Sequence, residues 1–485
     1  MNYDIIVIGA GLGGLTAGAK LAREGMKVLV IEQHSQPGGC ATTFRRGAFT
    51  LEVGLHEMDG PGSRDMKNRI FSELDVNGNV EFVTVPEFYR FIKGDLAVTI
   101  PHDPQLAAAR LSEMFPGDAE GIAAYFDQLL NPKKRAAGGP DISVGAFLDS
   151  IIRNDDLKLI LLGNLGYFHD DPYSLSLAYY SVAEGSYYTN GASFIKGGSQ
   201  KLSDHLAGYI KSHGGEVLLN HLVTGVTVKD GRATGVTCRK RNDPSHDTIE
   251  ATADEIVANN AIPALADLLP QEYGAQLRDE CVGLNTGASL LTVYFGFDRP
   301  LRELGHSYYS TFIYDTSVRS QADIAVNNRY DFARRSFTFV DYGQVDSGLT
   351  SAGKGVGAVC CIDYPDHWEN LGKEEYEQKK EYVAQTFIGR LEEVIPGFKD
   401  VIGYYEVGTP LTVKRYTLNP GGAVYGFAQN PGRKILDSFA PVENLHFASA
   451  WGKTGGGFSG AIVGGYLSAY NIMRKKTGRR NAGKE

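Results

Sequence analysis

The first 32 residues constrain the fold most, because a strand, a glycine turn, a helix and a second strand follow one another there without interruption. Residues 4–8 are a short apolar run rich in β-branched side chains, which is typical of a buried parallel strand. Gly9, Gly11 and Gly14 follow directly in the spacing G-x-G-x-x-G. The first glycine suits a tight turn, the second lets the backbone approach a pyrophosphate, and the third lets the helix pack closely on the strand. Phosphates would then bind the N–H groups at the positive end of the helix dipole.

An acid ends the second strand of this unit, over 26–31. Glu32 comes about 20 residues after the glycines, where a carboxylate would accept hydrogen bonds from an adenosine ribose. An α/β unit without a nucleotide is the alternative, but strand, turn, helix, strand and acid stand here in order. The sequence therefore predicts a dinucleotide-binding unit.

A second flexible segment follows the acid. Residues 36–43 are QPGGCATT, and Gly38 and Gly39 would let the chain fold over the far side of a long dinucleotide. An ordinary turn is the alternative interpretation. Arg45 and Arg46 are candidate neighbours of a phosphate or a flavin.

Composition and charge exclude several classes of function. The chain has 485 residues, of which 42% are hydrophobic, and this suits two or three domains with a large core. A net charge of −9 does not favour nucleic-acid binding. No apolar run is long enough to span a membrane, although the protein could lie on one. Met1 leaves no room for a targeting peptide, and five cysteines without metal spacing indicate a reducing cytoplasm, no structural disulfide and no metal.

The α/β pattern stops between about residues 60 and 194. The sequence predicts a hairpin from 80–91 and 96–100, helices over 104–115, 117–130 and 157–166, and a loop over 131–140. An aromatic-rich stretch then either lines a pocket for a long, flat, apolar molecule or packs in a core. Its aromatic residues are Tyr167, Phe168, Tyr173, Tyr179, Tyr180, Tyr187, Tyr188 and Phe194.

The α/β pattern returns after residue 195. A helix begins near Ser199, a hairpin surrounds Asp230 and Gly231, and a further pair of strands is expected over 248–260, ending at Asn259. The backbone of Val223 is expected on the adenine side of the nucleotide. Strands over 289–300, 334–342 and 356–363 without intervening helices predict an antiparallel sheet in a second domain, and a long helix is expected over 374–394.

A second glycine-rich site lies near the C-terminus. A strand over 445–448 is followed by Gly455, Gly456 and Gly457 and by a helix that is apolar nearly all round from 461 to 473 and is therefore expected to be buried. The N-terminus of such a helix suits the negative charge on N1 and O2 of a reduced flavin. The basic residues beyond this helix are typical either of a segment that contacts an anionic membrane surface or of a helix end exposed to solvent. These residues are Arg474, Lys475, Lys476, Arg479 and Arg480.

Five motifs together resemble the phytoene desaturase, carotenoid isomerase and retinol saturase group of FAD-dependent oxidoreductases. They are the glycine fingerprint ending in Glu32, the PGG at 37–39, ADEIVANNA at 253–261, GTPLTVKRYTLNPGGAVYGF at 408–427 and GGGFSGA at 455–461. GGCATTF…VGLH, with Cys40 and His56, resembles the retinol saturase branch most. The resemblance implies an α/β fold. A discontinuous Rossmann-type FAD domain of the glutathione-reductase or amine-oxidase type would be joined to an α+β substrate domain on an antiparallel sheet. The expected FAD-binding parts are 1–80, 195–285 and 405–475, the substrate parts are 81–194 and 286–404, and 476–485 is a basic tail.

Three residues depart from the pattern. Cys40 stands where the wider amine-oxidase-like superfamily commonly has Arg, and Ser449 and Trp451 stand where desaturases carry glycines. Trp451 is expected to change the space beside the flavin.

The predicted site combines these motifs. Catalytic candidates are His56, Glu57, Lys414 and Tyr425, with Arg415 and Tyr416 in the same segment as Lys414. A structural histidine is the alternative for His56. The residues expected to bind FAD are Gly9, Gly11, Leu12, Gly13, Gly14, Glu32, Gln33, Gly38, Gly39, Cys40, Arg45, Val223, Asn259, Trp451, Gly456, Gly457, Ser459 and Gly460.

The expected reaction is hydride transfer between flavin N5 and a carbon of an apolar, unsaturated, isoprenoid-like substrate, with saturation, desaturation and isomerisation all left open. Because no second G-x-G-x-x-G unit opens a helix, electrons are expected from visiting NAD(P)H or a redox protein, or they leave to oxygen or a quinone. An amine oxidase and a non-enzymatic lipid-binding or prenyl-binding protein, as in GDP-dissociation inhibitors, are the alternatives. The expected location is the cytoplasm, with contact at the cytoplasmic face of a membrane.

Overall fold

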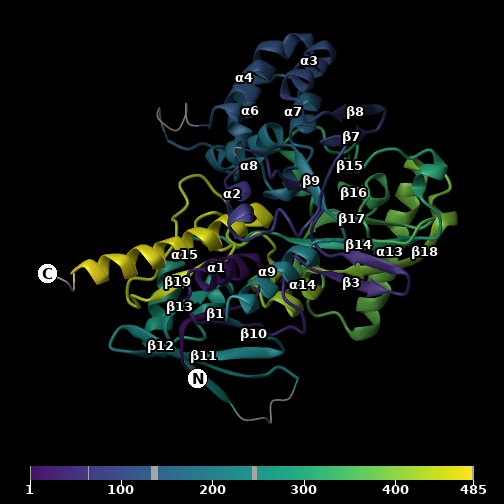
Figure 1. Ribbon diagram of the computed structural model, residues 1–485. Coiled ribbons are helices and arrows are strands. Elements are labelled where there is room, and N and C mark those ends of the chain that lie inside the picture. Colours follow the sequence, from purple (N-terminus) through teal and green to yellow (C-terminus); the bar gives the residue numbers. More distant parts are fainter. Residues whose placement is uncertain (1, 64, 133–139, 243–247, 483–485) are drawn as a thin grey trace.

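A computed structural model describes residues 2–63, 65–132, 140–242 and 248–482, with side chains described as far as 476. The expected loop over 131–140 falls mostly outside these residues, as do the side chains of Arg479 and Arg480. Figure 1 shows a body with the glycine unit, a helical lobe above it and a large sheet beside both.

The body is built on a seven-stranded sheet. Its strand order is β10-β2-β1-β13-β12-β11, and β19 pairs with the end of β13. The strands β1, β2, β10, β13 and β19 are parallel, whereas β12 is antiparallel to β11 and β13. Their bounds are β1 (Asn2–Ile8), β2 (Val28–Ile31), β10 (Glu216–Leu218), β11 (His221–Lys229), β12 (Arg232–Lys240), β13 (Ile249–Ala258) and β19 (Leu445–Phe447). The expectation of two strands over 248–260 is wrong, because one continuous strand pairs with β12 at its start and with β1 and β19 at its end.

Three helices cover one face of this sheet. The helix of the glycine unit, α1 (Leu12–Arg23), packs between α9 (Gln200–Ser212) and the terminal helix α15 (Gly457–Ala482). Alternation along β1 separates two cores, because Ile5 and Val7 face the α1 side while Ile6 and Ile8 face the opposite side. The first and last helices of the chain therefore lie side by side (Figure 1).

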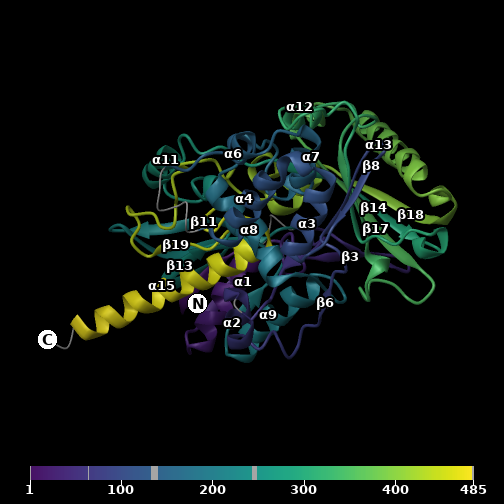
Figure 2. The same ribbon diagram turned by 90° about the horizontal axis from the view of Figure 1, so that it is seen from above.

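The terminal helix is buried on one side only, which corrects the expectation of a fully buried helix. Ile462, Tyr466, Ala469 and Ile472 are buried, whereas Tyr470 is 46% exposed. Figures 1 and 2 show the C-terminal part of α15 leaving the body, so its outer side meets no other element there.

The second sheet is the predicted antiparallel sheet, with one exception. Its order is β18-β14-β17-β16-β15-β7-β8, and only β15 and β7 are parallel. On β14, Leu291, Val293 and Phe295 pack on α13 (Lys373–Val394), which covers the outer face (Figure 2), while Tyr294 faces inward. The bounds are β7 (Tyr89–Lys93), β8 (Leu96–Ile100), β14 (Ser289–Phe297), β15 (Ser310–Ile313), β16 (Phe337–Asp341), β17 (Gly355–Asp363) and β18 (Ile402–Gly408).

The strand expected over 80–91 is divided. Residues Phe82–Thr84 form β6, which pairs with β9 (Ala192–Ile195) in a small sheet completed by β5 (Met58–Asp59), and only β7 forms the hairpin with β8. Pro86 lies between β6 and β7, and proline has no N–H group to continue a ladder.

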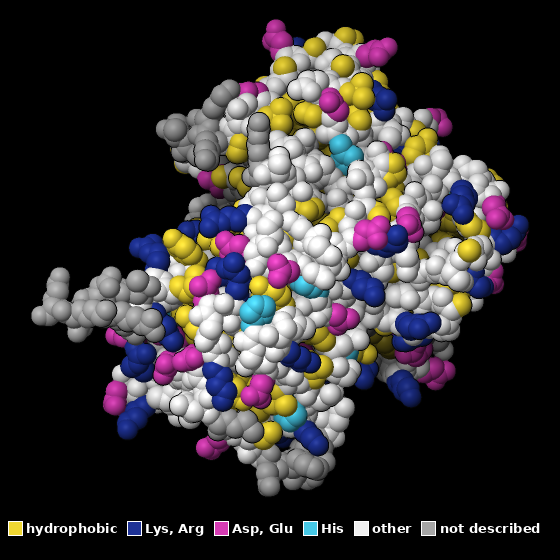
Figure 3. All heavy atoms as spheres, viewed as in Figure 1, with side chains coloured by type: hydrophobic (Ala, Val, Ile, Leu, Met, Phe, Trp, Pro, Cys, Tyr) yellow, Lys and Arg dark blue, Asp and Glu magenta, His cyan; other side chains and the backbone are white. Residues whose placement is uncertain are grey.

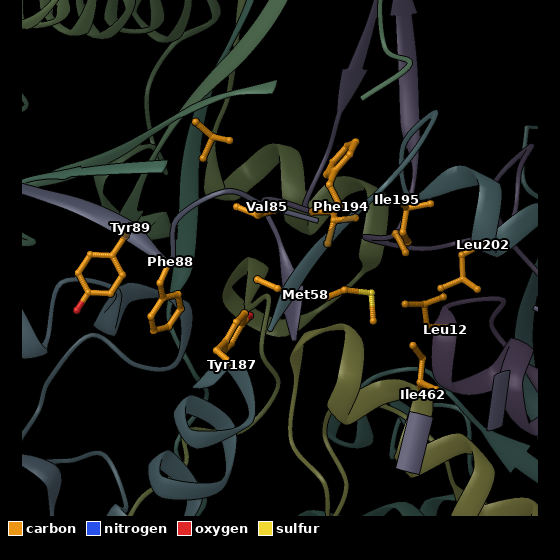
Figure 4. Close-up of a cluster of buried hydrophobic side chains, with 14 of the residues drawn as sticks. Leu12, Met58, Val85, Phe88, Tyr89, Tyr187, Phe194, Ile195, Leu202 and Ile462 are labelled. Atoms are coloured by element: carbon orange, nitrogen blue, oxygen red, sulfur yellow. The ribbon is translucent and has the colours of Figure 1, made fainter. Parts of the chain in front are cut away.

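The helical lobe joins the two sheets through one hydrophobic core. Its helices are α3 (Pro104–Met114), α4 (Ala119–Leu130), α6 (Val144–Ile151), α7 (Asp155–Leu161) and α8 (Leu177–Asn190), so the helix expected over 157–166 ends early. In Figure 4 the cluster runs from Leu12 and Ile462 through Met58 and Phe194 to Phe88. The remaining elements are β3 (Thr43–Arg46), β4 (Phe49–Glu52), α2 (Met66–Glu73), α10 (Ile262–Leu265), α11 (Gln271–Glu280), α12 (Asp323–Asn327) and α14 (Pro410–Thr417).

The predicted fold class is confirmed: an α/β Rossmann-type body carries a second domain built on a largely antiparallel sheet. Among the described residues, none of the helices combines the length and the apolar character needed to cross a bilayer. On the face shown in Figure 3, acidic and basic side chains are interspersed rather than gathered by sign.

Candidate functional site

The glycine turn between β1 and α1 forms a cradle that side chains would fill. Gly9 has a φ of +93°, and a Cβ on Gly14 would lie 2.3 Å from the Gly9 carbonyl oxygen. Gly11 stands at the N-cap of α1 and provides no side-chain cap for the first turn. The N–H groups there are free of a capping side chain, so the turn fits a pyrophosphate.

Glu32 holds this turn from the end of β2. Its Oε2 accepts a hydrogen bond from the Ala10 N–H at 2.7 Å, and its Oε1 accepts one from the His34 N–H at 2.8 Å. Burial raises the pKa of Glu32 although both bonds lower it. Each carboxylate oxygen keeps a lone pair, so the expected acceptance from a ribose is compatible with this geometry.

The PGG segment lies directly on the glycine turn. The Gly38 N–H donates to the Ala10 carbonyl at 2.7 Å, and Gly38 pairs with Gly11 in an isolated bridge. Gly39 is exposed, and a Cβ on it would lie 3.4 Å from the Gly11 Cα. The backbones of the two glycine segments are therefore in direct contact, and Leu12 and Gly13 follow in the first turn of α1.

Asn259 supports the turn from behind. Its Nδ2 donates to the Gly9 carbonyl at 3.2 Å, and a Cβ on Gly13 would lie 2.7 Å from its Oδ1. The next residue, Asn260, keeps a buried Oδ1 without a partner among the described residues. Val223 is buried on β11, where its backbone is in register with Cys238.

The C-terminal glycine loop meets the same region. A Cβ on Gly456 would lie 2.4 Å from the Tyr425 Cα, and one on Gly460 would lie 2.6 Å from the Gly455 carbonyl oxygen. Gly457 begins α15 and is exposed, whereas the Ser459 hydroxyl donates to Asp59. This hydroxyl is engaged within the protein, which leaves the backbone of the loop to face a ligand.

Three expected neighbours of the cofactor lie outside the glycine turn. Gln33 donates to the Tyr416 carbonyl at 3.0 Å and accepts from Arg241. Arg45 is exposed on β3. The Arg46 guanidinium donates to the Glu406 carboxylate at 2.8 Å, so it is paired within the protein, and its place beside a phosphate or flavin stays a prediction.

Trp451 does not border open space, which corrects the expectation that it changes the room beside the flavin. Its side chain is 2% exposed and meets the Phe427 ring edge to face at a centroid distance of 5.0 Å. The indole packs in the core on the far side of the sheet from α1.

Lys414 is not a catalytic candidate in this fold. It lies on α14, its side chain is 51% exposed, and it pairs with Glu369 at 3.4 Å. Arg415 and Tyr416 on the same helix are exposed as well. The last turn of α14 points outward, so these side chains do not reach the interior.

Five neighbouring side chains instead form a deep cluster in the interior. Cys40, His56, Tyr167, Tyr179 and Tyr425 all keep accessible surface. Burial nevertheless raises the pKa of Cys40 to about 11 and that of Tyr179 to about 12. Burial raises the pKa of Tyr425 as well, and Cys360, Tyr179 and Cys40 lie close enough to raise it further. These deep side chains are therefore uncharged at neutral pH, and most of them are aromatic.

The aromatic stretch around residues 167–194 divides accordingly. Tyr167 and Tyr179 belong to the deep cluster, Tyr173 is exposed, and the rest serve mainly as packing. The buried members are Tyr180, Tyr187, Tyr188 and Phe194.

His56 is held in a defined orientation. Its Nδ1 lies 2.8 Å from the Tyr167 hydroxyl, so this hydrogen bond engages one of the two ring nitrogens. Burial lowers the pKa of His56 to about 4, so the imidazole is neutral at neutral pH. Three tyrosine hydroxyls hold the backbone around His56 by donating hydrogen bonds to its carbonyl groups. Tyr342 donates to Leu55, Tyr309 to His56 and Tyr187 to Glu57.

Glu57, the residue after His56, is buried. It is 7% exposed, and neither carboxyl oxygen has a hydrogen-bond partner among the described residues. Burial, with Glu184 and Glu87 nearby, raises the pKa of Glu57 well above its usual range. An unpaired buried carboxyl is stable only as the neutral acid, so Glu57 carries a proton.

The structure adds residues that the sequence did not single out. Tyr309 and Tyr342 hold the His56 segment, and Asp59 binds the start of α15. Asp59 follows His56 by three positions, but no sequence signal connects it with Ser459, 400 residues away.

Comparisons with known proteins agree on one family. A family model described as flavin-containing amine oxidoreductase matches residues 12–473. The chain is 24% identical to an all-trans-retinol 13,14-reductase of Danio rerio, with 98% of this chain and 86% of the relative covered. It is 26% identical to a chloroplastic prolycopene isomerase of an Oncidium hybrid cultivar, with 88% and 75% covered. It is 25% identical to a neurosporene-forming phytoene desaturase of Rhodobacter capsulatus, with 96% and 93% covered.

Solved structures share the fold. An oxidoreductase from Methanosarcina mazei superposes with a TM-score of 0.67 at 19% identity, covering 98% of this chain and all of that one. A putrescine oxidase with bound putrescine superposes with a TM-score of 0.65 at 16% identity, covering 98% and 99%. At these identities the likeness concerns the fold alone.

Proposed function

Since this chain belongs to the family of flavin-containing amine oxidoreductases and is an FAD-dependent oxidoreductase, we propose that it acts on carbon–carbon double bonds of a long, apolar polyene. The predicted family is the one that the relatives represent. Their names describe a reduction, an isomerisation and a desaturation, which are three changes at double bonds of isoprenoid molecules.

The deep cluster of neutral, mostly aromatic side chains is the observation that carries this proposal. Cys40, His56, Tyr167, Tyr179 and Tyr425 are neutral at neutral pH, because burial disfavours their charged forms. A neutral aromatic cluster offers contact area to an extended apolar molecule and no ion pair to an ammonium group.

The chain's own groups perform binding, orientation and exclusion of water. The first turn of α1 would hold the pyrophosphate and Glu32 the ribose, while the start of α15 would stabilise the negative charge of a reduced flavin. When bound, FAD supplies the centre that gives or takes a hydride. The buried aromatic side chains exclude water, and the hydrogen bond between Tyr167 and Nδ1 orients the neutral His56 ring.

An external partner must exchange electrons with the flavin, and we include this partner in the proposal. NAD(P)H, a quinone, oxygen or a redox protein can serve, because the described fold has one dinucleotide unit. We further propose a cytoplasmic location with peripheral contact to a membrane. Tyr470, Arg474 and Lys475 support this contact, because all three are exposed on the outer part of α15.

The test starts from purified protein with its visible flavin spectrum. The flavin is photoreduced without oxygen and mixed separately with all-trans-retinol and prolycopene, and the oxidised protein is mixed with phytoene. We expect a change in the flavin spectrum, or an isomerised product, with at least one polyene. Conversion of amines with peroxide release, and of none of the polyenes, would overturn the proposal in favour of an amine oxidase. Colourless folded protein that takes up no FAD would favour a lipid-binding or prenyl-binding scaffold.

A further inference from the structure

A buried ion cluster lies directly behind the start of α15. Asp59, at the end of β5, accepts a hydrogen bond from the Lys67 ammonium at 2.7 Å and further hydrogen bonds from the hydroxyls of Ser186 and Ser459. Lys67 also pairs with Asp65. Elements β5, α2, α8 and α15 therefore meet at one carboxylate.

Asp59 is ionised in this cluster. Burial raises its pKa, but Lys67 and the two serine hydroxyls lower it more, so the pKa lies below its usual value. The Lys67 and Asp59 side chains are 3% and 11% exposed, and that of Asp65 is 7% exposed. With two carboxylates and one ammonium, the cluster of Asp59, Asp65 and Lys67 carries a net charge of −1 and is largely shielded from water.

This charge lies close to Tyr179 and to the start of α15. Gly456 precedes α15 and has no side chain to cap the helix, and Ser459 is in its first turn. A Cβ on Gly455 would lie 3.0 Å from the Tyr179 ring. Asp59 is close enough to Tyr179 to raise the pKa of its hydroxyl, beyond the effect of burial. The titratable groups facing Asp59 are therefore Lys67, Asp65, Tyr179 and Tyr187.

We propose that Asp59 is a positioning residue that sets the reduction potential of bound FAD through the first turn of α15. Reduction adds negative charge at N1 and O2 of the flavin, and the positive end of a helix dipole stabilises that charge. The Asp59 carboxylate at the same helix end offsets part of this stabilisation, and charges act strongly there because little water screens them. Asp59 therefore lowers the potential.

This inference rests on FAD binding and not on the identity of the substrate. A lower flavin potential favours giving a hydride to a double bond, whereas a higher one favours removing a hydride from a saturated carbon. The ion cluster therefore biases the chain toward saturation over desaturation. The potential can be measured without any substrate, so the inference and the proposed function can fail independently.

The experiment compares Asp59→Asn with Asp65→Asn in the holoprotein. Both variants remove one carboxylate charge beside Lys67, but only Asp59 contacts Ser459 and the start of α15. Midpoint potentials are measured by equilibration with reference dyes, and unfolding temperatures are recorded in parallel. We expect D59N to raise the potential clearly and D65N to raise it less.

The controls separate charge from packing. Ser459→Ala breaks the contact with α15 but leaves the charge, so it should move the potential less than D59N does. An unchanged or lower potential in D59N, or an equal shift in S459A, would overturn the inference, and a lower unfolding temperature alone would show a purely structural role. If D59N does not retain FAD, the midpoint potential of D65N decides. A potential above that of the wild type supports the inference, and an unchanged potential refutes it.

Discussion

Replacing Gly465 with alanine tests whether α1 and α15 meet at a fixed distance. A Cβ on Gly465 would lie 2.1 Å from the carbonyl oxygen of Gly13, the second residue of α1. Ordinary contact begins at 3.4 Å, so the two helices would have to separate by about 1.3 Å. Because backbone atoms form both sides of the contact, no side-chain rotation can relieve it.

The expected loss of stability follows from two opposing terms. Overpacking of this kind costs up to about 3 kcal/mol. Alanine in place of glycine within a helix returns about 1 kcal/mol. We expect a net loss of about 2 kcal/mol, and a weakening of FAD binding by about tenfold or more because Gly13 belongs to the turn that faces the pyrophosphate.

Gly208 provides the matched control. It lies within α9, is exposed, and a Cβ on it would meet nothing within 4 Å. Gly208→Ala should therefore raise stability by about 0.5–1 kcal/mol and leave FAD binding unchanged. Urea unfolding of the apoprotein measures the first effect, and titration of the flavin fluorescence measures the second. If G465A is as stable as G208A and binds FAD equally well, the close contact between the two helices is not rigid and the reasoning fails.

Three further substitutions test other parts of the structure. Glu32→Gln leaves the amide oxygen to accept from one of two buried N–H groups, so we expect a loss of about 1–3 kcal/mol and weaker FAD binding in the same titrations; unchanged values would contradict the assigned contacts. Asp363→Asn leaves the buried Arg335 without its carboxylate and should cost about 3–5 kcal/mol at neutral pH. Burial raises the pKa of Asp363, but hydrogen bonds and Arg335 bring it below its usual value. The wild type should therefore be more stable than the variant by the full amount above about pH 4, and this difference in stability should shrink as the pH falls further. Urea midpoints of both proteins between about pH 3 and 7 measure it. Lys414→Ala should change polyene turnover less than twofold, because its side chain points into solvent; a large loss would return it to the catalytic candidates.

Local requirements made the nucleotide unit predictable. Gly9 needs a positive φ and Gly14 needs the absence of a Cβ, and both demands act within a few residues of the turn. The long helix now seen over Lys373–Val394 and the hairpin around Asp230 and Gly231 were predictable for the same reason. Sequence alone therefore determined the fold class, the glycine cradle and the acid at the end of β2.

Side-chain direction was harder to predict, because it depends on what the fold brings against each element. Trp451 and Lys414 were assigned to the cofactor or the chemistry from their motifs, yet Trp451 packs in a core, and Lys414 points into solvent. A motif specifies which residues are present but not which face of an element will be covered.

Only the tertiary structure decided which groups share the interior. Tyr167 meets His56 across 111 positions, and Ser459 meets Asp59 across 400. Burial then changes their chemistry, because a neutral histidine, a protonated Glu57 and an ionised Asp59 result from desolvation and from partners supplied by distant segments. Local sequence selects the elements, whereas the electrostatic environment of a buried group is the sum of everything packed around it.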